Sequence, residues 1–196
     1  FKFLFLFLEA LQEKEEEFKH VVKLGRTCLQ DAVPVTLGQE FSGYVHFVRR
    51  QIEKLEAIQG KCLDIPLGAT AVGTGLSTFT GYCKSVYAHL QSISGLPVTK
   101  EENFFDGLQN GDIYIETSSV VKSLATGLSK IATDLRILSS GPRAGFNEIR
   151  LPAVQPGSSI MPGKVNPVMP ELMNQIGYQI CGNDVAITMA VEGGEL

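Results

Sequence analysis

The feature that most constrains the fold is an apolar stripe that runs without interruption through residues 112–139. Its members alternate spacings of three and four residues: Val121, Leu124, Leu128, Ile131, Leu135 and Leu138. A repeat of 3.5 residues is typical of a helix that packs nearly parallel or antiparallel to its neighbours. Residues 36–59 and the stretch after Asn166 keep the same period. The sequence therefore predicts three long helices, each about 36–42 Å long at ~1.5 Å per residue.

Three such helices need partners for their stripes, which indicates an all-α fold built as an elongated bundle of long helices. Residues 1–24 are predicted to form another helix, ended by Gly25, and a loop is expected at 26–34. Thr36 and Gln39 have the spacing of a capping box at the start of the next helix. A Gly- and Thr-rich segment at 62–80 and a short helix at 81–94 follow, with no strand predicted. Asn183 is expected to be a buried polar residue on the stripe of the last helix.

The length of 196 residues indicates one domain, or part of a larger one, over residues 1–196. The net charge of −4 argues against nucleic-acid and membrane-surface partners, and the apolar residues 1–8 are too few to span a bilayer. The four cysteines are widely spaced and form no metal pattern with the three histidines. We therefore expect reduced thiols in a cytoplasmic protein, without a metal or cofactor. Because the chain starts at Phe1 and stops within a helical pattern, we expect it to be a fragment of a longer protein.

A loop that carries anion-recognising groups is predicted at residues 157–167, which read Gly-Ser-Ser-Ile-Met-Pro-Gly-Lys-Val-Asn-Pro. Pro162 and Pro167 disfavour regular structure, and the two glycines allow a ligand to approach the backbone closely. The loop offers amide groups, two hydroxyls, one ammonium and one carboxamide, all of which recognise anions. It is not a P-loop, because five residues separate Gly157 from Gly163 and Val165 follows the lysine.

This run closely resembles the signature loop of the aspartase/fumarase superfamily, the homotetrameric lyases that make or consume fumarate. Further segments that fit the family lie at 25–41, 67–76, 139–145 and 182–184. The resemblance covers nearly everything from about residue 9 to residue 196. It implies the central helical domain of that fold, whose long helices assemble with those of three other subunits, without the family's N-terminal and C-terminal domains.

The resemblance also implies a reaction, the anti elimination of ammonia from L-aspartate or of water from L-malate to give fumarate. The hard step is removal of a proton beside a carboxylate, which leaves an aci-carboxylate whose charge fixed donors must stabilise. By the match, Ser158 would be the base that takes the Cβ proton, provided that amide groups and positive charge stabilise its alkoxide. Lys164 would bind a substrate carboxylate, with Asn166 fixing the loop or the same group. Without the family, a structural cap would be the more natural interpretation of Ser158.

Ser159 and Thr27 would bind carboxylate oxygens through their hydroxyls, beside Cys28. This cysteine departs from the family, which often has His and sometimes Gln at the position, and a thiol is a weak donor. A role for Cys28 as a proton donor or strong carboxylate ligand is therefore in doubt. The family builds each active site from three segments on three subunits, and its first segment lies upstream of this chain. We therefore expect this chain alone to lack a complete site.

Three functions remain open at this point. Asn174 and Gln175, after Pro-Glu, resemble the aspartate ammonia-lyases of the family, whereas fumarases tend to carry Thr-Gln-Cys-Glu directly after Asn-Pro. The first prediction is therefore elimination of ammonia from L-aspartate. The alternatives are a fumarate hydratase, with water as the leaving group, and a catalytically incomplete helical assembly core.

Overall fold

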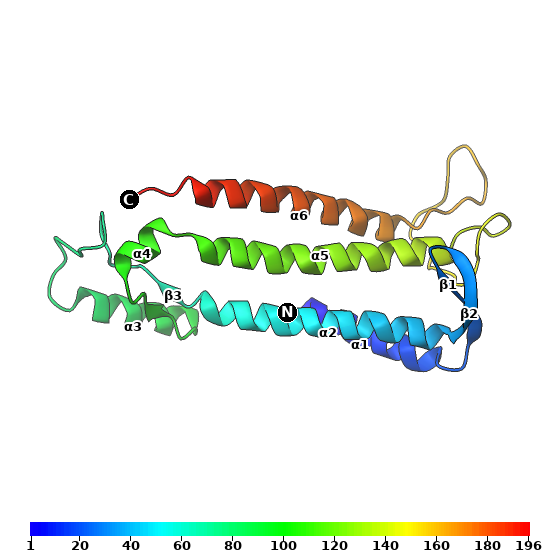
Figure 1. Cartoon of the computed structure of the whole chain (residues 1–196), viewed down its shortest axis with the longest axis horizontal. Helices are drawn as coiled ribbons and strands as arrows, with labels where there is room; N and C mark the ends of the chain where they lie inside the picture. Colours follow the sequence, from blue (N-terminus) through cyan, green and yellow to red (C-terminus); the bar gives the residue numbers. More distant parts are fainter. The chain divides into compact units, whose positions relative to one another are not determined.

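The computed structural model describes all of residues 1–196, and Figure 1 shows its helices and strands, with labels on all except β4. The helices are α1 (Lys2–Glu17), α2 (Leu37–Lys61), α3 (Tyr82–Ser94), α4 (Phe104–Gln109), α5 (Asp112–Leu138) and α6 (Val168–Glu192). The strands are short, with β1 (Val22–Thr27) antiparallel to β2 (Gln30–Thr36) and β3 (Asp64–Ile65) parallel to β4 (Thr99–Lys100). The fold is predominantly helical, and its three long helices lie where the apolar stripes predicted them.

The chain divides into two compact units. Unit 1 comprises residues 1–54 and 123–178, and unit 2 comprises residues 55–122 and 179–196. Every residue of the candidate site belongs to unit 1. No helix in either unit combines the length and apolar character that crossing a lipid bilayer requires.

The core of unit 1 forms where apolar side chains of α2 pack against α1 and α5. Its buried members are Leu11, Leu37, Phe41, Tyr44, Val45, Val48, Ile52 and Ile131. The capping box predicted at the start of α2 is present. The Gln39 amide donates to Thr36 Oγ1 over 3.1 Å, and the Thr36 amide donates to Gln39 Oε1 over 2.9 Å. The cap and the buried stripe together explain why α2 begins at Leu37 and which face it turns inward.

Residues 22–36 form a β-hairpin, so the prediction of one helix over 1–24, followed by a loop, is wrong. Helix α1 ends at Glu17, and Gly25 lies inside β1 rather than after a helix. A Cβ at Gly25 would lie 2.7 Å from the carbonyl oxygen of Val33, so only glycine lets the two strands approach this closely. The prediction that the chain has no strand is wrong for the same reason. The sequence indicates the end of a helix at Gly25, but this residue lies in a strand and allows close pairing with the neighbouring strand.

Unit 2 contains all of α3 and α4, together with parts of the three long helices. The predicted short helix is confirmed as α3, and Gly81 and Gly95 flank it with φ angles of +87° and +68°. The hydroxyl of Tyr87 donates to the carbonyl of Ile65 over 2.5 Å and fixes α3 to β3. Helix α2 continues to Lys61, two residues beyond the predicted end at residue 59.

The buried polar residue of α6 in this unit is Asp184, so the prediction for Asn183 is wrong. Asn183 is exposed, whereas Asp184 is buried, accepts a hydrogen bond of 2.8 Å from Ser118 and forms an ion pair with Lys122. These two donors, both on α5, lower the pKa of the Asp184 carboxyl. The network ties α6 to α5 by a charged contact one residue away from the predicted one.

Candidate active site

Thr27 and Cys28 lie at the tip of the β1–β2 hairpin and are exposed. Thr27 pairs with Gln30, so only Cys28 and Leu29 form the turn between the strands. Their φ angles are +52° and +61°, and two positive φ angles are what a type I′ hairpin turn requires. Asn-Gly usually supplies this geometry, and the unusual Cys-Leu pair is why the sequence did not reveal the hairpin.

Ser158 lies in the predicted loop, where its side chain accepts hydrogen bonds from the backbone. The amides of Ile160 and Met161 each donate to Ser158 Oγ over 3.2 Å. The Ser158 amide donates to the carbonyl of Lys164 over 2.8 Å, which closes the loop on itself. Gly157 has a φ of +103°, a conformation that favours glycine and starts the turn. Ser158 Oγ is therefore held as an acceptor within a small ring of backbone donors.

The other predicted loop residues stand at the surface of the same turn. Ser159 and Lys164 are exposed, and Asn166 is partly buried just before α6 begins at Val168. Lys164 forms no ion pair with any acidic side chain of the chain, so its ammonium can accept an anionic partner. The loop therefore presents one cation and several neutral donors to solvent.

The structure brings these residues together within each segment but does not bond the two segments to each other. Both segments belong to unit 1, and Figure 1 shows them at the end of this unit where α5 ends and α6 begins. No hydrogen bond or ion pair joins Thr27 or Cys28 to Ser158, Ser159 or Lys164. Within one chain they form two separate clusters of candidate groups, one at the hairpin tip and one in the loop.

Behind the hairpin lies an ionic cluster that the sequence analysis missed. Glu148, ten residues before Ser158, forms ion pairs of 2.6 Å with both Lys23 and Arg26 of β1. Lys23 also donates to Glu40 of α2 over 2.8 Å. Burial alone would raise the pKa of the Glu148 carboxyl, but the bonds and charges of Lys23 and Arg26 outweigh it and lower this pKa. No local motif marks such a cluster, because its members come from separate segments.

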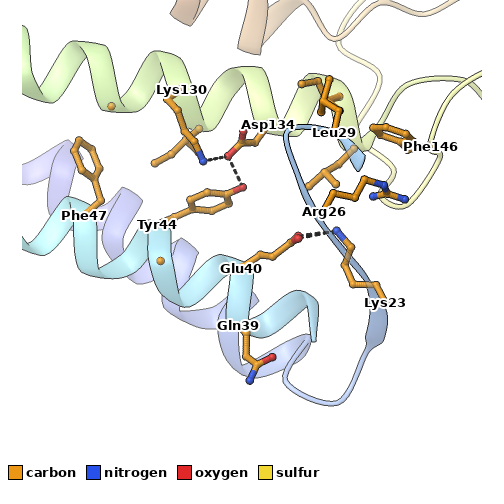
Figure 2. Close-up of a pocket in the computed structure, with 15 residues that line it drawn as sticks. Lys23, Arg26, Leu29, Gln39, Glu40, Tyr44, Phe47, Lys130, Asp134 and Phe146 are labelled. Atoms are coloured by element: carbon orange, nitrogen blue, oxygen red, sulfur yellow. Dashed lines mark hydrogen bonds and ion pairs between the residues drawn. The ribbon is translucent and has the colours of Figure 1, made fainter. Parts of the chain in front are cut away.

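An open pocket of about 640 Å³ lies between the hairpin, α2 and α5, but none of the predicted site residues lines it. Figure 2 shows Tyr44 and Lys130 directed at Asp134, and Glu40 directed at Lys23. The Tyr44 hydroxyl donates to Asp134 Oδ2 over 2.9 Å. Burial, and then the neighbouring Asp134 carboxylate, raise the pKa of Tyr44, so Tyr44 remains a neutral donor. Acids and bases in this pocket are already paired, and they stabilise the junction of α2 with α5.

Asn174, chosen from the sequence as a marker of the reaction type, packs between helices. It is 2% exposed on α6. Its amide nitrogen donates to the carbonyl and hydroxyl of Ser129 over 2.8 Å each and to Thr133 Oγ1 over 3.1 Å. Its oxygen accepts a 2.8 Å hydrogen bond from Arg136. Asn174 therefore satisfies buried polar groups between α5 and α6, and it does not lie in the loop with Ser158.

Comparisons with known proteins agree with the resemblance seen in the sequence. A family model described as Lyase matches residues 3–182. Aspartate ammonia-lyase of Bacillus subtilis is 52% identical over 187 residues, which cover 95% of this chain and 39% of that enzyme. Aspartate ammonia-lyase of Helicobacter pylori is 48% identical, with 96% of this chain and 40% of that enzyme covered. The chain thus spans about two fifths of the length of these curated relatives.

Solved structures show the same relationship in three dimensions. A structure described as fumarate lyase:delta crystallin from Brucella melitensis, bound to cobalt, matches with a TM-score of 0.93 at 47% identity. The matched region covers 98% of this chain and 42% of the Brucella melitensis chain. Class II fumarase from Schistosoma mansoni matches with a TM-score of 0.95 at 36% identity, over 98% of this chain and 43% of that one. With its helices, its loop at 157–167 and these relatives in agreement, the chain belongs to the lyase family of the aspartase/fumarase superfamily.

Proposed function

We propose that the protein containing this chain is an aspartate ammonia-lyase, which eliminates ammonia from L-aspartate to give fumarate. The observation that carries the proposal is the environment of Ser158, whose Oγ accepts two backbone amide hydrogen bonds in a closed, glycine-initiated turn. The identity to curated aspartate ammonia-lyases, 52% and 48% in the two cases above, supports aspartate as the substrate. The lower identity to the fumarase, 36%, makes water the less favoured leaving group.

In the proposed reaction Ser158 acts as the base. Its alkoxide removes a proton from Cβ of the substrate, and the electron pair moves into the adjacent carboxylate to form an aci-carboxylate. That pair then forms the Cα–Cβ double bond as the Cα–N bond breaks and ammonia leaves. A serine hydroxyl is normally too weakly acidic for this task. The amides of Ile160 and Met161 supply the preorganised donors that stabilise an alkoxide at this position.

The remaining predicted residues bind the substrate in this proposal. Lys164 pairs with a substrate carboxylate, and its lack of an acidic partner leaves it available for that role. Ser159 and Thr27 donate hydroxyl hydrogen bonds to carboxylate oxygens, and Asn166 holds the loop or the same group. Cys28 lies beside Thr27 at the hairpin tip and contributes contact rather than charge, because a thiol is a weak donor.

The proposal includes a shared site in a homotetramer. The hairpin and the loop are separate clusters within one chain. Apolar side chains on the long helices are also largely exposed, namely Phe3 on α1 and Met169 and Val185 on α6. Burying such apolar surface against other subunits would give the elongated bundle that the long helices predict. The partners are then a small dicarboxylate and three further copies of the chain, in a cytoplasmic enzyme that acts on neither nucleic acid nor membrane.

The test is fumarate formation by the complete protein, followed by ultraviolet absorbance with L-aspartate and L-malate in parallel. The expected result is activity on aspartate alone, reduced by about 10³-fold or more in Ser158→Ala, since the base is lost. Ser94→Ala is the matched control, because Ser94 is an exposed serine at the end of α3. Activity on malate alone would replace the proposal with a fumarase. Inactivity on both, from an assembled tetramer, would favour the helical assembly core.

A further inference from the structure

The hairpin that carries Thr27 is connected to the rest of unit 1 through Glu148. Its two carboxylate oxygens divide between two cations of β1: Oε2 lies 2.6 Å from Lys23 Nζ, and Oε1 lies 2.6 Å from Arg26 Nη1. The three side chains are well shielded, with exposed fractions of 17% for Glu148, 10% for Lys23 and 18% for Arg26. Shielding from solvent strengthens such pairs, so this contact differs from an ordinary surface salt bridge.

The backbone around Glu148 is fixed to the end of α5. The Glu148 amide donates to the carbonyl of Leu138 over 2.9 Å, and the Asn147 amide donates to the carbonyl of Ser140 over 2.8 Å. The Phe146 amide donates to Ser140 Oγ over 3.0 Å. The carboxylate that holds the hairpin is therefore anchored to the last turn of a 27-residue helix.

Arg26 adds a second contact with the same segment. Its guanidinium lies 4.1 Å from the centroid of the Phe146 ring, and Figure 2 shows the two side chains next to each other. A cation over an aromatic face and a charged hydrogen bond together fix both the position and the plane of the guanidinium. Arg26 directly precedes Thr27, so fixing Arg26 fixes the backbone that presents the Thr27 hydroxyl.

The hairpin needs this external support. A two-stranded hairpin alone is marginally stable in water, and the tip of this one is a left-handed Cys-Leu turn with exposed side chains. The ion pair within the hairpin, between Arg26 and Asp31, is long at 3.8 Å, and Asp31 is mostly exposed. Glu148 therefore supplies the stronger of the two carboxylate contacts to Arg26.

We propose that Glu148 is a positioning residue, whose carboxylate holds the β1–β2 hairpin so that Thr27 meets a carboxylate of the substrate. This inference rests on the proposed function of Thr27 in substrate binding. Glu148 itself does not touch the substrate. It acts through Lys23 and Arg26, and it also lies on the segment that leads from α5 to the loop with Ser158. One carboxylate thus sets the position of the hairpin relative to the start of that loop.

The test compares Glu148→Gln with Asp31→Asn in the complete protein. Both replace a carboxylate that contacts Arg26 by its amide, and neither changes side-chain shape much. We expect Glu148→Gln to raise KM for L-aspartate about tenfold and to change kcat less than about threefold, as loss of ground-state positioning would. We also expect faster amide hydrogen exchange in residues 22–36, measured by mass spectrometry without substrate. Asp31→Asn should leave both quantities unchanged.

The two readouts separate failure of this inference from failure of the proposed function. Unchanged KM and unchanged exchange in Glu148→Gln would overturn the inference, as would a fall in kcat at constant KM. A wild-type protein inactive on aspartate would end the proposed function, and hydrogen exchange would still decide whether Glu148 holds the hairpin. Should Glu148→Gln not assemble, Arg26→Lys provides the same test. It keeps the charge but loses the planar group that contacts Glu148 and Phe146, so slow exchange and normal KM there would overturn the inference.

Discussion

The hairpin and the loop at 157–167 each carry part of the candidate site, but they are held in different ways. Side chains outside the hairpin hold it through Glu148 and Glu40, which pair with Lys23 and Arg26 of β1. The loop is held from within, because the bonds that shape it involve Ser158 itself. A residue that shapes its own loop cannot be altered without changing chemistry and geometry together, whereas the support of the hairpin can be altered while Thr27 stays intact.

Among changes that leave every proposed site residue in place, the largest expected effect comes from Gly157→Ala in the loop. Gly157 has a φ of +103°, and a Cβ there would lie 3.1 Å from the carbonyl oxygen of Lys164, which accepts the closing hydrogen bond. Strain of this kind costs about 1–3 kcal/mol, which the loop can relieve by leaving this turn conformation. We therefore expect kcat/KM to fall about 10- to 100-fold, and the melting temperature to fall less than the full strain would require. Steady-state kinetics and a thermal melt measure the two quantities.

Gly60→Ala is the control for this change. Gly60 lies in the last turn of α2 with no atom within 4 Å of an added Cβ, so alanine should leave activity intact. Full activity in Gly157→Ala would show that the loop functions without its left-handed start. The loop would then not depend on its own internal bonds for function, contrary to the contrast drawn with the hairpin.

Gly25→Ala in the hairpin is expected to have the next largest effect, and mainly on stability. The added Cβ would lie 2.7 Å from the Val33 carbonyl oxygen, which forces the strands apart at a cost of about 2 kcal/mol. The urea midpoint should fall, and KM should rise because the Thr27 tip moves. An unchanged midpoint would mean that β1 and β2 can separate freely, contrary to a hairpin held tightly by Glu148.

Thr36→Ala tests the other end of the hairpin, where β2 passes into α2. Removing the Oγ1 that accepts from the Gln39 amide should lower stability by about 1 kcal/mol, the usual cost of a lost N-cap. Thr36→Ser keeps the acceptor and should restore the urea midpoint, with kcat/KM unchanged in both variants. Equal destabilisation by serine and alanine would assign the effect to the Thr36 methyl group instead of the cap.

The smallest effect is a pH dependence that distinguishes Glu148→Gln from the wild type. The folded-state pKa of Glu148 lies below its ordinary value of 4.5, so its stabilising contribution is present above that pH. The contribution is lost as the pH falls through the lowered pKa, because protonation removes the charge that pairs with Lys23 and Arg26. The melting temperatures of the two proteins should therefore differ above about pH 4.5 and converge below it. A difference that persists in acid would assign the effect to packing.

The sequence predicted the long helices well because each apolar stripe is a local, repeated signal that tertiary contacts reinforce. It failed at the hairpin for two reasons. A glycine such as Gly25 can either end a helix or allow two strands to pair closely, and the Cys28-Leu29 turn lacks the residues that normally mark a tight turn. In α6 it selected Asn183, although Asp184, one residue away, is the buried group that meets Lys122. The period of an apolar stripe shows which face of a helix is buried, but it does not identify the buried residue to within one position.

In the candidate site too, features set by neighbouring residues in the sequence could be predicted, whereas contacts between distant segments could not. The composition of the loop indicated backbone donors around a serine, and Ser158 does accept two of them. The ionic cluster of Glu148 could not be predicted, because its partners Lys23 and Arg26 come from the other end of the chain. Whether Thr27, Cys28, Ser159, Lys164 and Asn166 bind substrate stays a prediction for the experiments above.

The packing of Asn174 has a consequence for efforts to redesign the reaction. In the sequence this residue distinguished ammonia-lyases from hydratases, but its four hydrogen bonds all go to residues of α5. A residue that marks a reaction type in the sequence thus serves, in the folded chain, to join two helices. Replacing Asn174 would therefore leave buried donors and acceptors of Ser129, Thr133 and Arg136 without a partner, so we expect such a change to act first on the α5–α6 contact.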